Sequence, residues 1–142
     1  MTPAQVKLVQ DSFAKVAPIS EQAAALFYGR LFEIAPEAKP LFKADMSEQG
    51  RKLMATLAVV VNGLSNLNTI LPAASALAKR HVAYGVEPGH YAPVGEALLW
   101  TLERGLGQPG WTQELAAAWA AAYATLSQFM IGEAYGRPAA AE

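Results

Sequence analysis

The stretch LAKRHVAYGV, residues 77–86, is the segment that decides how the chain folds and what it binds. It is typical of a helix end, because a helical run that carries His81 is followed by Gly85, a helix-stopping residue. Leu77 lies one turn before His81 and therefore on the same helical face. An apolar face that ends in one imidazole suits the axial ligand of a haem iron. A lone histidine on such a face is also commonly a packed, satisfied side chain, so the remaining sequence has to decide.

The composition indicates one unusually apolar domain. The chain has 142 residues, of which 53% are hydrophobic and 16% are charged. We therefore expect a single domain over residues 1–142, with enough apolar side chains for a full core and a cofactor pocket. The formal net charge of −1 gives no reason to expect a nucleic-acid partner or an acidic membrane surface. Because the sequence contains no cysteine, disulfides, thiolate nucleophiles and zinc–thiolate sites are excluded.

Neither a targeting signal nor a membrane span is apparent. The chain starts with MTPAQ and lacks the basic and apolar regions of a signal peptide. No uninterrupted apolar run approaches the roughly 20 residues that span a bilayer. We expect a cytoplasmic protein without membrane association.

Helical periodicity predicts an all-α protein. Apolar residues recur at helical spacing from about residues 2 to 17, 20 to 35, 47 to 62, 69 or 72 to 84, 87 to 106 and 112 to 135. Residues 36–42 hold two prolines and are expected to form a tight turn or a single-turn helix. The tail from about residue 136 is expected to be disordered.

Capping residues support these helix starts. Thr2 and Gln5 have the spacing of a capping box. Ser20, Ser47 and Thr112 are expected to cap the second, third and last long helices.

Six short motifs follow one another in an order and spacing that resemble the globins. They are LFYGRLF at residues 26–32, Pro36 with Leu41-Phe42, RKLM at 51–54, KRH at 79–81, HYAPVGE at 90–96 and AWAAAY at 118–123. The likeness covers about residues 5 to 135 and is strongest to single-domain bacterial globins related to neuroglobin and to the haem domain of flavohaemoglobins. It implies a globin fold of about seven helices around a pocket for haem b.

The resemblance assigns roles to individual residues. His81 matches the proximal ligand, and we expect its second ring nitrogen to bond a backbone carbonyl near Leu77. Phe42 matches the phenylalanine that packs on the haem. Tyr28 and Gln49 match a distal pair whose donors would hold dioxygen, each worth about 1.5–3 kcal/mol. The alternative for Gln49 is an ordinary solvated residue at a helix start.

Further residues are expected to contact the cofactor. Lys52 and Arg80 are candidates for the haem propionates, although both would also serve as ordinary surface charges. The apolar walls are expected to comprise Leu53, Leu57, Leu77, Val86, Tyr91, Val94, Leu98, Leu126 and Met130. Ala24 and Gly50 are small residues at the point where the two distal helices are expected to cross.

The chain also departs from flavohaemoglobins. Their last helix carries a glutamate that contacts the proximal tyrosine and histidine, whereas Ala134 stands at that position here. Glu133 precedes it and points about 100° away around the helix. A strongly anionic proximal histidine is therefore in doubt. These residues also contain no counterpart of the flavin and nicotinamide reductase domain.

Two functions remain open at this stage. One is reversible, high-affinity binding of dioxygen and other diatomic gases such as carbon monoxide and nitric oxide. The other is an enzymatic conversion of nitric oxide to nitrate with electrons from a separate reductase. A haem-free helical module is a third reading. The choice between carrier, sensor and scavenger, and the oligomeric state, stay open.

Overall fold

The computed structural model describes residues 2–42, 46–83, 86, 88–107 and 110–135. The expected helix stop at Gly85, the start at Glu87 and the tail from residue 136 lie outside the described residues. Within them every regular element is helical, so the all-α prediction is confirmed. The described residues form six α-helices and four short 3₁₀ segments: α1 (Pro3–Val16), η1 (Ala17–Ile19), α2 (Ser20–Ile34), η2 (Pro36–Leu41), α3 (Met46–Gly63), η3 (Leu67–Thr69), α4 (Leu71–Ala83), η4 (Pro88–His90), α5 (Tyr91–Leu106) and α6 (Gln113–Tyr135).

The expected seventh helix is the 3₁₀ segment η2. Its prolines supply no backbone N–H, which prevents a regular α-helical hydrogen-bond ladder. At two of the expected caps the helix begins earlier in the chain than expected. Ser20 is the first residue of α2 and Ser47 lies inside the first turn of α3, so neither precedes its helix as a cap would.

Two other helix starts are capped as expected. The Gln5 amide donates to Thr2 Oγ1 at 3.1 Å, and the Thr2 amide donates to Gln5 Oε1 at 3.0 Å. At the start of α6 the Leu115 amide donates to Thr112 Oγ1 at 3.1 Å. These bonds satisfy backbone donors that have no partner within their helices.

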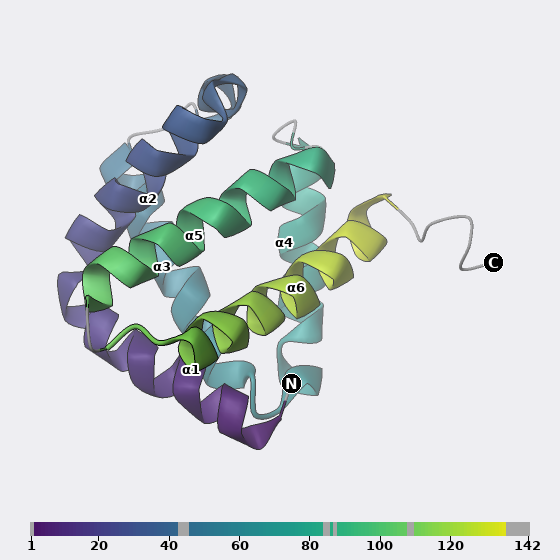
Figure 1. Cartoon of the computed structure of the whole chain (residues 1–142). Coiled ribbons are helices and arrows are strands. Elements are labelled where there is room, and N and C mark those ends of the chain that lie inside the picture. Colours follow the sequence, from purple (N-terminus) through teal and green to yellow (C-terminus); the bar gives the residue numbers. More distant parts are fainter. Residues whose placement is uncertain (1, 43–45, 84–85, 87, 108–109, 136–142) are drawn as a thin grey trace.

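The helices form two crossed layers, with α5 and α6 in front of α3 and α4 in the view of Figure 1. α2 packs on α3 and α5, α1 packs on α3, α5 and α6, and α4 packs mainly on α6. A buried hydrogen bond from Trp119 Nε1 to Ser12 Oγ, 2.9 Å long, joins α6 to α1. Ser12 Oγ in turn donates to the Val9 carbonyl, so both polar groups are satisfied inside the core.

The buried side chains form two apolar clusters. The main core contains residues of α1, α2, α3, α5 and the first half of α6. A second, smaller cluster contains Ala78, Tyr91 and Met130, with half-buried apolar side chains around them. The two clusters share none of the described residues.

Among the described residues one helix, α6, is long and apolar enough to cross a membrane by length and composition alone. Residues Gln113–Ala134 include a window with a mean hydropathy of 1.2. Leu115, Ala118, Trp119 and Ala122 of this helix are buried in the main core. α6 therefore contributes one face to the main core.

Candidate functional site

The expected pocket residues divide between the two apolar clusters. Those that belong to the main core or pack against it are Tyr28, Phe42, Leu53, Leu57, Val94 and Leu98. Those that belong to the second cluster or pack against it are Leu77, Val86, Tyr91, Leu126 and Met130. A flat apolar group that bridged the two clusters would bury apolar surface on both of its faces. The apolar side chains of the two clusters are therefore of the kind that contact a haem.

His81 lies in the last turn of α4 and is half-buried. Its Nδ1 is 2.8 Å from the Leu77 carbonyl oxygen, which confirms the hydrogen bond expected there. A carbonyl oxygen only accepts, so this partner assigns the ring proton to Nδ1 and the lone pair to Nε2. Burial lowers the pKa of His81, the bond to Leu77 opposes that effect, and the charge of Arg80 adds to it. The imidazole is therefore neutral near pH 7, the form in which histidine ligates metals.

Tyr91 packs beside His81 at the start of α5. The two rings are 6.4 Å apart between centroids, and their planes are inclined by 26°. Ala134 packs against the same cluster, whereas Glu133 is exposed and accepts a 2.7 Å hydrogen bond from Ser75 Oγ of α4. The Glu133 carboxylate of α6 thus bonds α4 at the surface, whereas Ala134 packs against the cluster that contains Tyr91.

Tyr28 projects from α2 toward the start of α3. Its hydroxyl donates to the Gln49 backbone carbonyl across 3.3 Å, which is long for an O–H···O bond. The Tyr28 and Phe42 rings meet edge to face with centroids 5.3 Å apart. Burial raises the pKa of Tyr28 to about 12, so the phenol keeps its proton and remains a donor. A hydroxyl with a weak present partner can be redirected to a ligand at small cost.

The crossing of α2 and α3 is close, as expected from its small residues. A Cβ atom built on Gly50 would lie 2.9 Å from the Cβ of Ala24. Any side chain at position 50 would therefore separate the two helices. Gln49 adjoins this contact and is half-buried, so its position depends on the close approach.

Lys52 and Arg80 are exposed. Lys52 Nζ lies 3.6 Å from Glu48 Oε1 in a surface pair one helical turn apart. Such a pair stabilises the fold by about 0–1 kcal/mol and would yield readily to a stronger anion. The role of both cations toward haem propionates stays a prediction.

Two polar contacts near the site could not be expected from the sequence. Tyr123 Oη donates to the Tyr91 carbonyl at 2.6 Å, and Ser75 donates to Glu133. The partners are 32 and 58 residues apart in the chain. The one available signal was Gly95 inside α5, because glycine within a helix often marks a close approach.

The chain is similar in sequence to known proteins. The Globin family model matches residues 25–130. A flavohemoprotein of Bordetella parapertussis is 36% identical over 109 residues, which are 75% of this chain and 27% of that protein. A flavohemoprotein of Vibrio cholerae is 29% identical over 134 residues, which are 92% of this chain and 34% of that protein. The chain thus spans about a third, or less, of the length of these curated relatives.

Solved structures superpose on nearly the whole length of this chain. A bacterial globin from Campylobacter jejuni superposes with a TM-score of 0.80 at 26% identity, covering 93% of this chain and 95% of that one. An engineered carbene transferase, made from a Rhodothermus marinus protein provisionally assigned as a nitric oxide dioxygenase, gives a TM-score of 0.80 at 28% identity and covers 89% and 88%. With the family model matched over residues 25–130, the chain belongs to the globin family, and its membership implies that it binds haem.

Proposed function

We propose that this globin binds haem b through His81 and holds a diatomic gas, dioxygen above all, with donors from Tyr28 and Gln49. The observation that carries the proposal is the hydrogen bond between His81 Nδ1 and the Leu77 carbonyl. It directs the Nε2 lone pair away from the helix's own backbone, as an axial ligand requires. Because the sequence has no cysteine, a thioether-linked haem is excluded, and this supports haem b.

When bound, haem supplies an iron with a coordination position for a diatomic gas. The protein's own part is to keep one face apolar and to offer donors above it. Tyr28 is neutral and buried, and among the described residues its hydroxyl bonds the Gln49 carbonyl at 3.3 Å. The Gln49 amide comes from the first turn of α3, next to the close crossing at Gly50. Both groups would donate to the partial negative charge of bound dioxygen and slow its release.

A second candidate function is conversion of nitric oxide to nitrate. The likeness to flavohemoproteins and to the Rhodothermus marinus protein favours it. Nitric oxide, dioxygen and one electron together give nitrate, so each turnover needs an electron from outside these residues. A separate reductase would supply it. The same distal donors would hold and orient the dioxygen for the reaction.

The first experiment is an absorption spectrum of the purified protein in ferric, ferrous and carbon monoxide forms. We expect a Soret band in each form and a ferrous carbonyl spectrum typical of histidine ligation. His81→Gly should lose the axial bond, and added imidazole should restore it. His90→Gln, at the only other histidine of the chain, is the matched control and should keep the wild-type spectrum. An unchanged spectrum in His81→Gly would refute the proposal.

A second experiment separates the two candidate functions. A strain that lacks the protein is tested for growth under nitric oxide, and then complemented with wild type or with Gln49→Leu. Nitric oxide sensitivity that only the wild type relieves favours the dioxygenase. Normal growth, together with slow dioxygen release from the purified protein, favours reversible gas binding.

A further inference from the structure

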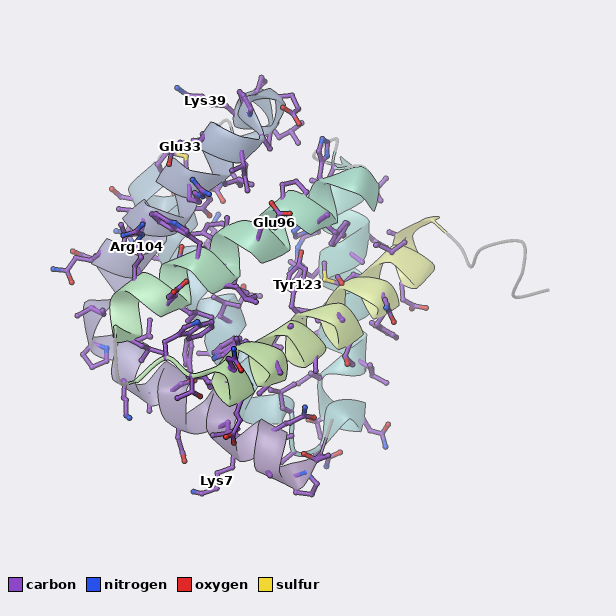
Figure 2. All side chains as sticks on the ribbon, in the orientation of Figure 1. Lys7, Glu33, Lys39, Glu96, Arg104 and Tyr123 are labelled. Atoms are coloured by element: carbon purple, nitrogen blue, oxygen red, sulfur yellow. The ribbon has the colours of Figure 1, made fainter. Side chains whose placement is uncertain are left out.

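Tyr123 joins α6 to the first turn of α5. Its hydroxyl donates to the Tyr91 carbonyl at 2.6 Å, a short and therefore strong contact. Figure 2 shows Tyr123 between α6 and α5, while Glu96 projects from a different side of α5. Burial raises the pKa of Tyr123 and the neighbouring Tyr91 adds to the shift, so the hydroxyl stays protonated and donates.

Gly95 gives the Tyr123 ring access to the α5 backbone. A Cβ atom at position 95 would lie 2.7 Å from Cε2 and 2.9 Å from Cδ2 of that ring. Real side chains do not approach so closely, so any other residue would displace the ring or the helix. The contacts at Tyr91 and Gly95 are one turn apart. Together they fix both the height and the rotation of the start of α5 relative to α6.

The position of α5 is passed to His81 through the Tyr91 side chain. That side chain is buried, and its ring packs against the imidazole at 6.4 Å between centroids. His81 is held on its own helix by the Leu77 bond, so Tyr91 limits how the ring can turn about that bond. The carboxylate of Glu133 takes no part in these contacts, because it accepts from Ser75 on the exposed side.

We propose that Tyr123 is a positioning residue for the proximal ligand: it sets the orientation of the His81 imidazole toward haem by holding the Tyr91 backbone, and Gly95 makes this contact sterically possible. The inference rests on the proposed axial role of His81. In this proposal the Tyr123 hydroxyl and the Tyr91 carbonyl order the proximal side, where α6 presents Ala134.

The test is resonance Raman spectroscopy of the ferrous, ligand-free protein, in which the iron–histidine stretching band reports the geometry of the axial bond. Tyr123→Phe removes only the hydroxyl and should shift and broaden this band. Thr125→Val is the matched control, because Thr125 is an exposed residue of the same helix whose hydroxyl bonds its own helix at Ala121. The control band should coincide with that of the wild type.

Gly95→Ala provides a second, independent perturbation. It leaves the Tyr123 hydroxyl in place but pushes the ring away, and it should shift the band in the same direction as Tyr123→Phe. If Tyr123→Phe fails to hold haem, Gly95→Ala alone decides. A wild-type protein with no iron–histidine band would refute the axial role of His81. A normal wild-type band that both variants leave unchanged would refute the positioning role alone.

Discussion

Replacing Tyr28 by phenylalanine tests the distal side with a single atom. The ring packs edge to face on Phe42 at 5.3 Å and stacks with Phe32 at 6.1 Å between centroids. Phenylalanine keeps the ring and fills nearly the same volume, so the packing stays. Only the hydroxyl and its bond to the Gln49 carbonyl are lost.

The size of the effect follows from the geometry of the Tyr28 hydroxyl. A hydrogen bond to a charged ligand is worth about 1.5–3 kcal/mol. To reach the ligand the hydroxyl must leave the Gln49 carbonyl, and at 3.3 Å that bond is worth no more than about 0.5 kcal/mol. The net contribution is therefore about 1–2.5 kcal/mol, so Tyr28→Phe should release dioxygen about 5- to 70-fold faster.

The assay is stopped-flow displacement of dioxygen from the ferrous protein by excess carbon monoxide. Carbon monoxide release provides an internal control, because bound carbon monoxide carries little charge and gains little from a donor. Gln49→Leu tests the second donor in the same way. A dioxygen off-rate within twofold of the wild type in Tyr28→Phe would show that this hydroxyl does not reach the ligand.

Three further predictions concern packing, buried hydrogen bonds and pH. Gly50→Ala should lower the free energy of unfolding by about 1–3 kcal/mol, because its Cβ would lie 2.9 Å from α2. Gly29→Ala, whose Cβ meets nothing within 4 Å, should instead be neutral or stabilising by up to about 1 kcal/mol; thermal melts that rank the two variants the other way would contradict this. Ser12→Ala should cost about 1–3 kcal/mol in urea titrations, since the Trp119 indole N–H loses its buried acceptor, and a cost near zero would mean that another acceptor replaces it. Burial raises the pKa of Tyr28 from 10.0 to about 12, so its contribution to stability is fully present below pH 10 and is lost as the pH rises through 12. The fall in the free energy of unfolding between pH 9 and pH 11.5, measured by urea titration, should therefore be smaller for Tyr28→Phe than for the wild type. Equal falls in the two proteins would exclude this linkage.

The fold could be predicted from the sequence because its signals are local. The Thr2–Gln5 capping box, the prolines after the first two helices and the periodic apolar residues all act within one or two turns. The predicted cap at Ser47 was wrong, because neighbouring turns compete for the helix start and Ser47 lies inside α3. A serine near a helix start indicates the region of a cap and not the exact residue.

The candidate site was only partly open to prediction. The bond between His81 and Leu77 follows from helical spacing and could be expected. The bond from Tyr28 to a backbone carbonyl of α3, and that from Tyr123 to the backbone of α5, join residues far apart in the chain. An aromatic residue at helical spacing is usually a core residue. Gly95 indicates a close approach to α5 but does not identify Tyr123 as the partner.

The small size of the second cluster has a consequence for the life of the protein in a cell. Among the described residues this cluster buries only Ala78, Tyr91 and Met130, and α4 packs mainly on α6. A haem held by His81 would add contacts between α4 and the main core, and so would raise the free energy needed to open α4 locally. Newly made chains that bind no haem would therefore expose α4 to proteolysis, and the abundance of the protein would follow the supply of haem.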